Sequence, residues 1–331
     1  MEHLPIIIVH CGNSFYLEPI LRQNRYFNPD NRICLVSDKS TSRIAHAEHF
    51  LIDDYMSSAK EFQKIYRHYS VNTVAFELFC FQRWFCVLDF IKEQKMEHFV
   101  CIDSDYLLYE SIDNIMRPYL SYDMTLLGTS GAMCALFSRE SLQRFCDFCT
   151  QLYTEEKYLT LIREMYEEIK NIKKIGAISD MTAVELYRRY VSDNVVDIAV
   201  PRHKLCMDLR LWSPIGFETE SHTDLMGRAP KKIYWRNNRP YGKFLTPTPE
   251  ADSEGLVRFG GLHLQGGSKR MLPRLLLNKK GELRYNRWTI IRWYLRPAVF
   301  TQVFCKALRW YLTPSVIRHR ILGKRRKLFF Q

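Results

Sequence analysis

The stretch Phe99-Val100-Cys101-Ile102-Asp103-Ser104-Asp105 decides how the chain can fold, because an apolar run passes directly into two acids. Residues 99–102 predict a buried strand. Two carboxylates two positions apart point to opposite faces of a strand, but past its end, where the chain turns, they can converge on one cation. Acids at the carboxyl end of a buried strand also lie where open α/β sheets bind ligands. The alternative is a solvated turn in which one Asp caps the following helix.

Strand and helix patterns alternate on both sides of this stretch. Short apolar runs predict strands at residues 6–10, 33–36, 50–52, 124–127 and 132–137. Amphipathic patterns predict helices at residues 15–25, 59–69, 73–91 and 140–153, and residues 158–190 are also helical in pattern. Alternating β and α units predict an α/β fold with a mostly parallel sheet covered by helices on both faces.

Two segments add detail to this outline. In the predicted helix 73–91, which Asn72 or Thr73 would cap, the expected apolar stripe comprises Phe76, Phe79, Cys80, Trp84, Val87, Leu88 and Ile91. Residues 202–255 are irregular and rich in proline and aromatic residues, so we expect a loop-rich region around a ligand.

Composition excludes several classes of protein. The 331 residues are 47% apolar and 25% charged, which excludes a disordered chain, a collagen-like repeat and a small disulfide-stapled scaffold. Ten cysteines are too sparse for a disulfide framework and lack the paired spacing of a zinc site, which indicates a reducing cytosol. With no export signal and no apolar run of about 18 residues, we expect a cytoplasmic protein without a membrane-spanning helix.

The net charge of +12 is concentrated at the end of the chain. Residues 269–331 hold 17 Lys and Arg but one acid, Glu282. Residues 283–331 predict two or three basic amphipathic helices that carry Trp288, Trp293 and Trp310. They would bind an anionic membrane surface peripherally or pack on the preceding domain. Nucleic acid is a less favoured partner, because no known binding motif accompanies the charge.

A second candidate site follows the pattern His263-x-x-Gly266-x-x-Lys269, which is rarer by chance than D-x-D. Its flanking glycines, Gly260, Gly261 and Gly267 among them, let the backbone approach a ligand closely. His263 can complete a metal shell as neutral imidazole, and Lys269 can reach a phosphate as a point charge. The alternative is a buried histidine beside a surface turn.

The β/α half, the D-x-D and the late H-x-x-G-x-x-K together resemble glycosyltransferases of the GT-A fold, most of all glycosyltransferase family 8 and related bacterial polysaccharide enzymes. The resemblance covers residues 5–270. It implies that Asp103, Asp105 and His263 hold Mn²⁺ or Mg²⁺, and that this ion grips the diphosphate of a nucleotide sugar. It also implies that Lys269 touches the phosphate.

The resemblance suggests further residues that bind the donor. Arg83, placed 20 positions before the D-x-D, matches a basic donor-contacting residue of the family, although it could instead be a helix-surface arginine. The first strand-turns usually receive the nucleoside, although any α/β sheet needs such turns. The donor-binding set suggested in this way comprises His10, Gly12, Asn13 and Asp38, with Ser104 and Gly266 beside the metal ligands.

The segment Ile178-Ser179-Asp180-Met181-Thr182 resembles the acidic acceptor-side loop of that family. Asp180 would orient or deprotonate the acceptor hydroxyl. The alternative is that Asp180 caps a helix over residues 182–190. The chain departs from the family pattern at two places: Met181 replaces a common Gln, and Arg270-Met271 replace a common Pro-Trp.

We therefore expect a GT-A catalytic domain over residues 1–282, with a nucleotide-sugar half (1–138) and an acceptor half (139–282), followed by the basic tail 283–331. The resemblance implies a metal-dependent glycosyltransferase that moves a sugar from a UDP-sugar to a glycan or lipid-linked acceptor. It also implies that Asp105 and Asp180 are the catalytic residues. One alternative is a sugar nucleotidyltransferase, although residues 10–14 lack its Gly-rich basic loop. Another is a non-catalytic membrane or nucleic-acid adaptor of the same fold.

Overall fold

A computed structural model describes residues 2–128, 134–173, 177–221, 223, 229–278 and 281–282. The chain divides into two compact units, Met1–Arg270 and Met271–Gln331. The boundaries expected at 138/139 and 282/283 remain predictions.

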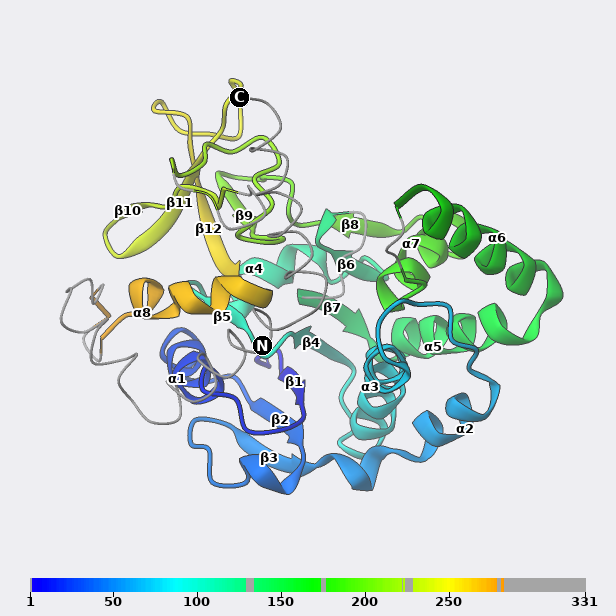
Figure 1. The fold of residues 1–331 in the computed structure, drawn as a ribbon. Helices are drawn as coiled ribbons and strands as arrows, with labels where there is room; N and C mark the ends of the chain where they lie inside the picture. Colours follow the sequence, from blue (N-terminus) through cyan, green and yellow to red (C-terminus); the bar gives the residue numbers. More distant parts are fainter. Residues whose placement is uncertain are drawn as a thin grey trace, which may run out of the picture. The chain divides into compact units, whose positions relative to one another are not determined.

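The first unit is built on a seven-stranded sheet with the order β3-β2-β1-β4-β7-β6-β8 (Figure 1). Its strands are β1 (Ile6–His10), β2 (Ile33–Ser37), β3 (Glu48–Leu51), β4 (His98–Ile102), β6 (Met124–Leu126), β7 (Cys134–Ser138) and β8 (Val195–Asp197). Strands β3, β2, β1 and β4 are parallel, whereas β7 runs antiparallel to β4 and β6. The expected mixed α/β architecture is confirmed, with strand ends shifted by one or two residues.

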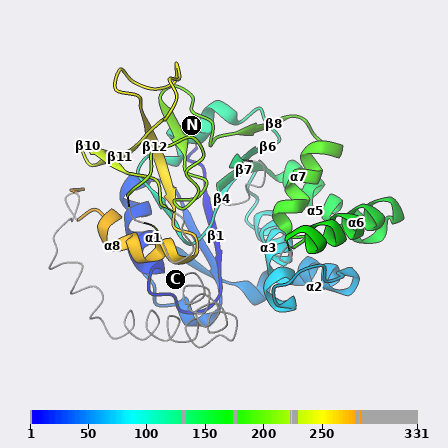
Figure 2. The same ribbon diagram turned by 45° about the horizontal axis from the view of Figure 1, so that its top comes forward.

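Both faces of this sheet are buried, because successive strand residues enter different cores. Ile7 and Cys101 face one core, while Ile6, Ile8 and Val100 face the other. The first core is completed by α2 (Ser57–Ile65), α3 (Val74–Glu93), α5 (Arg139–Thr154), α6 (Glu156–Lys173) and α7 (Asp180–Tyr190). The second is completed by α1 (Leu17–Phe27) and α4 (Ile112–Met116). Figure 2 shows α1 on one side of the sheet and the α2, α3 and α5 group on the other.

Helix α3 is buried on more of its surface than the predicted stripe. Thr73 caps it, accepting a hydrogen bond from the Phe76 amide at 3.4 Å. Phe76 is nevertheless 58% exposed, so its place in the stripe was wrong. The buried apolar residues that the stripe omitted are Phe81, Phe85, Cys86 and Phe90. The reason is that α3 packs against α2, α5 and β1 together, so its later turns are covered on several sides.

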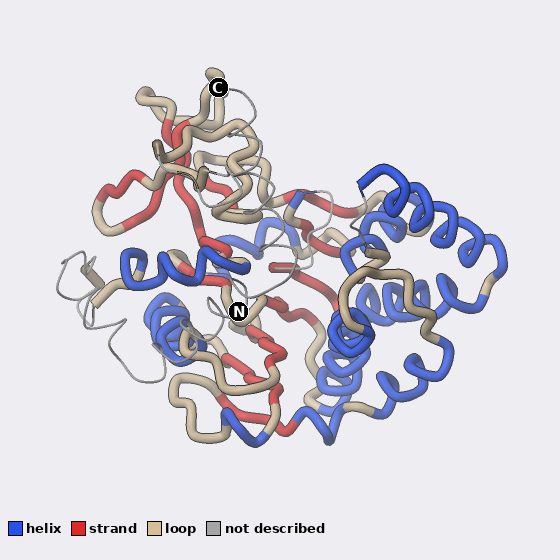
Figure 3. The backbone as a smooth tube through the Cα atoms, viewed as in Figure 1, coloured by secondary structure: helices blue, strands red, loops and turns tan. Residues whose placement is uncertain are grey.

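A second sheet takes three short strands from the segment that we expected to be irregular. Its strands are β5 (Tyr106–Leu108), β9 (Leu205–Met207), β10 (Tyr234–Arg236), β11 (Arg239–Lys243) and β12 (Leu256–His263). They follow the order β10-β11-β12-β5, with β9 parallel to β12. Figure 3 shows that long loops connect the short strands of this part of the chain. The prediction of irregular structure was wrong for β9, β10 and β11, because strands of three to five residues leave too short a periodic signal. Short 3₁₀ turns complete the unit: η1 (Lys39–Thr41), η2 (Ile52–Tyr55), η3 (Arg117–Tyr119) and η5 (Gly266–Met271).

In the second unit the described residues form α8 (Leu272–Leu275), and the Asn278 amide donates to the Glu282 carbonyl at 2.7 Å. The basic helices expected over residues 283–331 lie outside the described residues. Within the described part of the chain, no helix has both the length and the apolarity needed to cross a membrane. The nine described cysteines are all free thiols.

Candidate active site

The turn after β4 carries the two acids and leads directly into β5. The Tyr106 amide donates to the Asp103 carbonyl at 2.9 Å, which closes the turn. Strand β5 then pairs antiparallel with β12, and the register places His263 opposite Tyr106. Because His263 is the last residue of β12, this pairing delivers its imidazole to the carboxyl end of β4.

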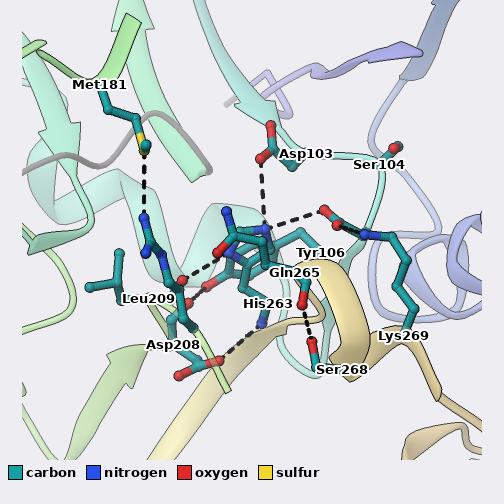
Figure 4. Close-up of polar contacts among 12 residues, drawn as sticks. Asp103, Ser104, Tyr106, Met181, Asp208, Leu209, His263, Gln265, Ser268 and Lys269 are labelled. Carbon is teal, nitrogen blue, oxygen red and sulfur yellow. Dashed lines mark hydrogen bonds and ion pairs between the residues drawn. The ribbon is translucent and has the colours of Figure 1, made fainter. Parts of the chain in front are cut away.

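Asp103, Asp105 and His263 form a cluster in which one ligand atom from each lies within 4.8 Å of the others (Figure 4). His263 Nε2 is 3.3 Å from Asp105 Oδ1 and 3.7 Å from Asp103 Oδ2. The other oxygen of each acid meets a cation: Arg83 Nη1 lies 2.7 Å from Asp103 Oδ1, and Lys269 Nζ pairs with Asp105 Oδ2. Each acid thus directs one oxygen at the imidazole and the other at a fixed positive charge.

The imidazole of His263 is oriented by the backbone behind it. Its Nδ1 lies 2.8 Å from the Leu209 carbonyl oxygen, which can only accept, so Nδ1 carries a proton and Nε2 faces the acids. Burial lowers the pKa of His263, but the hydrogen bond and charge of Asp105 raise it by more. A divalent cation bound between the acids would take the place of a proton on Nε2.

The two acids differ in their titration because their neighbours differ. Burial raises the pKa of Asp103, and the charge of Arg83 only partly offsets this effect. Burial acts on Asp105 in the same sense, but His263 and Lys269 together hold its pKa well below the usual range.

The ligand atoms of the three side chains suit a divalent cation. Two carboxylates and an imidazole of fixed tautomer are ligands that Mn²⁺ accepts, and Mg²⁺ favours the carboxylates. An ion that lies about 2.1–2.3 Å from each of its ligands separates two ligands on opposite sides of it by about 4.4 Å. The ligand atoms of Asp103, Asp105 and His263 all lie within 4.8 Å of one another, which is close to that separation. The three side chains therefore fit such an ion.

Arg83 on α3 joins the D-x-D turn to Asp180. Its Nη1 binds Asp103, and its Nη2 lies 2.6 Å from Asp180 Oδ2, which also accepts from Trp84 Nε1 at 3.1 Å. The guanidinium is therefore a bridge between two acids and not a solvated surface group. Oδ2 of Asp180 thus accepts two hydrogen bonds, one from Arg83 and one from Trp84.

The helix that follows begins at Asp180 itself, with Ser179 as its N-cap residue. The alternative that Asp180 caps a helix over residues 182–190 was therefore wrong. The Ser179 amide donates to the Thr182 hydroxyl at 3.3 Å, which leaves the Asp180 side chain to Arg83 and Trp84.

The turn after β1 lies beside the same cluster. His10 Nδ1 is 2.9 Å from the Ser104 hydroxyl, and its buried Nε2 has no hydrogen-bond partner among the described residues. The Gly12 amide donates to Asp38 Oδ2 at 2.5 Å, and Gly12 has the positive φ of 83° that glycine adopts readily. His10 and Ser104 are thus brought to the acids, while Asp38 holds the turn. Asn13 follows Gly12 in that turn.

The glycines around His263 serve two purposes. Gly266 has a φ of 59° and open space around it, as expected of a turn near a ligand. At Gly261, however, an added Cβ would lie 2.5 Å from Tyr106 Cε1, and at Gly260 it would lie 2.8 Å from Met207 Sδ. These two glycines therefore admit neighbouring side chains of the fold. The expectation that they admit a ligand was wrong for both.

Sequence reasoning missed an ion pair behind His263. Lys231 Nζ lies 2.5 Å from Asp208 Oδ1, and both side chains are almost completely buried. Asp208 Oδ2 accepts from the His263 amide at 3.1 Å, so the pair holds the end of β12. No local signal marks the pair, because Asp208 and Lys231 come from irregular segments 23 positions apart and meet only in the folded chain.

No protein family model matches the sequence, and no curated protein matches it either. Among solved structures, the chain is similar to the apo form of mouse xyloside xylosyltransferase 1, with a TM-score of 0.42 and 7% identity over 62% of this chain and 88% of that one. It is also similar to the apo structure of WbbM, a bifunctional glycosyltransferase, with a TM-score of 0.37 and 9% identity over 62% of this chain and 40% of that one.

Proposed function

We propose that the protein is a metal-dependent glycosyltransferase that transfers a sugar from a UDP-sugar to a glycan or lipid-linked acceptor in polysaccharide biosynthesis. One observation carries the proposal: Asp103, Asp105 and His263 converge beside Lys269 at the carboxyl end of a buried strand. A diphosphate leaving group needs positive charge held at such a place. We propose in addition that the enzyme resembles glycosyltransferase family 8.

The charges of the cluster support a requirement for the metal. With His263 counted as the neutral imidazole that would bind a metal, the acids Asp103, Asp105 and Asp180 and the cations Arg83 and Lys269 have a summed formal charge of −1. A divalent cation changes this sum to +1. Since an anionic diphosphate is repelled by the first arrangement and attracted by the second, we expect the donor to bind after the ion.

The reaction breaks the bond between the anomeric carbon and a phosphate oxygen and forms a bond from that carbon to the acceptor oxygen, while the proton of the acceptor hydroxyl passes to the departing diphosphate. Positive charge develops on the sugar and negative charge on the departing diphosphate. The bound ion would supply Lewis-acid stabilisation of that diphosphate. Lys269 adds a fixed positive charge beside it, and the carboxylate of Asp105 keeps the ammonium in place.

On the other side of the cluster, Asp180 orients the acceptor hydroxyl. Arg83 positions Asp180 and Asp103 together, because one guanidinium donates to both carboxylates. His10, Ser104 and Gly266 border the donor, with Gly12, Asn13 and Asp38 forming the turn that receives the nucleoside.

The test is release of UDP from a panel of UDP-sugars, measured with Mn²⁺ and after EDTA. We expect at least one UDP-sugar to release UDP only with the metal. Asp105→Ala should abolish release while the protein stays folded, and Asp54→Ala, an exposed acid, serves as the matched control. Equal release by the wild type and Asp105→Ala would contradict the proposal. Formation of a nucleotide sugar from a nucleoside triphosphate and a sugar phosphate would instead indicate a nucleotidyltransferase.

We also propose that residues 283–331 bind an anionic membrane surface, where a lipid-linked acceptor would be presented. The support is the run of Lys and Arg interleaved with Trp and Tyr. Flotation with anionic liposomes should recover the full chain but not a chain that stops near residue 283. Equal flotation of both would refute the anchor.

A further inference from the structure

Arg210 lies beside the candidate active site, on the side away from Lys269. It follows Leu209, whose carbonyl orients His263, and its Nη2 is 3.7 Å from Sδ of Met181, the residue after Asp180. Figure 4 shows Met181 and Lys269 on opposite sides of His263. The positive charge of Arg210 is therefore placed toward the segment that carries Asp180.

Among the described residues, Arg210 has no acidic partner within ion-pair distance. In the described part of the chain, its side chain contacts the thioether of Met181, a weak acceptor, and its buried Nε has no hydrogen-bond partner there. A guanidinium stays charged at any physiological pH and offers five N–H donors. Since a partly buried charge without a counter-charge is unfavourable, an anion that reached this guanidinium would be stabilised.

The backbone that carries Arg210 is held in place on both sides. The Asp208 amide donates to the Gly261 carbonyl at 3.1 Å, and the Leu211 amide donates to the His263 carbonyl at 3.3 Å. The Arg210 carbonyl itself accepts from Lys231 Nζ at 3.0 Å. The guanidinium is thus presented from a segment tied to the same strand that carries His263, which reduces the entropy lost when a ligand binds.

We propose that Arg210 binds a negatively charged group, a carboxylate or a phosphate, on the acceptor. That the ligand is an acceptor rests on the proposed function, which assigns the Asp180 side to the hydroxyl that is glycosylated. That the ligand is anionic rests on the guanidinium alone, which has no acidic partner among the residues that the structure describes. The forked donors of arginine suit both groups, because each presents two oxygens in one plane.

The test compares the binding of matched sugars by calorimetry. The probes are methyl β-D-glucuronide, glucose 6-phosphate and the neutral methyl β-D-glucoside, each titrated into the full chain with and without UDP and Mn²⁺. The variants are Arg210→Gln, which removes the charge, and Arg210→Lys, which keeps it but loses the fork. Arg202→Gln removes an exposed arginine of the neighbouring segment and is the matched control.

We expect the wild type and Arg202→Gln to bind one charged probe at least about tenfold more tightly than the glucoside. Arg210→Gln should lose this preference without weaker binding of the glucoside, and Arg210→Lys should retain part of it. The charged probe that is preferred identifies the group as carboxylate or phosphate. No preference in the wild type, or an unchanged preference in Arg210→Gln, would overturn the proposal.

A separate titration with UDP and Mn²⁺ distinguishes a failure of the Arg210 proposal from a failure of the proposed function. All variants should bind UDP as the wild type does, and weaker UDP binding by Arg210→Gln would place Arg210 at the donor and overturn the acceptor assignment. A wild type that binds no UDP but prefers the charged probe through Arg210 would refute the donor assignment while the anion site stands. Thermal unfolding of each variant confirms that it is folded, and Arg210→Lys supplies the comparison if Arg210→Gln is not.

Discussion

Tyr106 and His263 lie directly opposite each other in the pairing of β5 with β12, and their rings stack with centroids 5.6 Å apart and planes 19° apart. Tyr106 is the first residue after the D-x-D turn, so this one pair joins the two sequence motifs of the candidate site. Any change that separates the two rings should also separate the imidazole from the two acids.

Gly261→Ala tests that relationship. The added Cβ would lie 2.5 Å from Tyr106 Cε1, so the tyrosine ring or β12 must shift. We expect the free energy of unfolding to fall by about 1–3 kcal/mol, as for other overpacked sites. Gly267→Ala is the control, because its Cβ would meet nothing within 4 Å. Chemical denaturation of both variants checks the difference, and equal stabilities would show that Tyr106 moves without cost.

Lys231→Met tests the buried ion pair behind His263. The substitution leaves Asp208 buried without its counter-charge, and we expect a loss of about 3–5 kcal/mol in the free energy of unfolding. The matched control is Lys64→Met, because Lys64 pairs with Glu61 and both side chains are about two-thirds exposed. For that exposed pair we expect a loss of about 0–1 kcal/mol. Similar losses in urea denaturation of the two variants would speak against a structural role for the buried pair.

Asp113→Asn tests whether the hydrogen bonds that Asp113 accepts near the N-terminus make the stability of the protein depend on pH. Burial acts to raise the pKa of Asp113, but hydrogen bonds from the Leu4 amide, His3 and Asn31 lower it below the usual value. A carboxyl with a lowered folded-state pKa stabilises the protein above its unfolded pKa of about 3.9, and this contribution is lost as pH falls through the folded value.

The substitution should therefore lower the free energy of unfolding by about 1–3 kcal/mol at neutral pH, and the difference from wild type should shrink below about pH 4. Denaturation curves at several pH values measure it. The exposed Asp54→Asn controls for loss of one negative charge. A difference that stays constant down to pH 3 would show that ionised Asp113 is not the source.

Asp103→Asn tests the metal site by a binding measurement that does not depend on enzymatic activity. A ligand that binds only the folded state raises the unfolding temperature, so Mn²⁺ added to EDTA-treated wild type should stabilise it, by about 2.7 kcal/mol at 100 times Kd. Loss of one carboxylate should weaken Mn²⁺ binding, so this variant should need about tenfold more Mn²⁺ for the same shift. Asp54→Asn should respond as the wild type does, and an undiminished response by Asp103→Asn would remove this acid from the metal site.

Much of the first unit was predictable from local pattern. The strands at 6–10, 33–36 and 99–102 are short apolar runs between turns, and burial on both faces leaves little choice of structure for them. The strands β5, β9 and β11 were missed because pairing with β12 supplies a stability that three to five residues cannot show locally, and the same holds for β10, which pairs with β11. Phe76 was misplaced because periodicity describes one helix and not its neighbours.

The sequence alone determined which residue types were available for chemistry: two acids just past a buried strand, and a late histidine with a lysine six positions on. Those facts are local, because spacing and hydrophobic pattern are properties of neighbouring residues. Tertiary structure alone decided that the imidazole faces both acids, that Arg83 bridges Asp103 and Asp180, and that Arg210 has no acid beside it in the described chain. Such relationships depend on strand register and on buried charges that meet across the fold, and no local pattern encodes them.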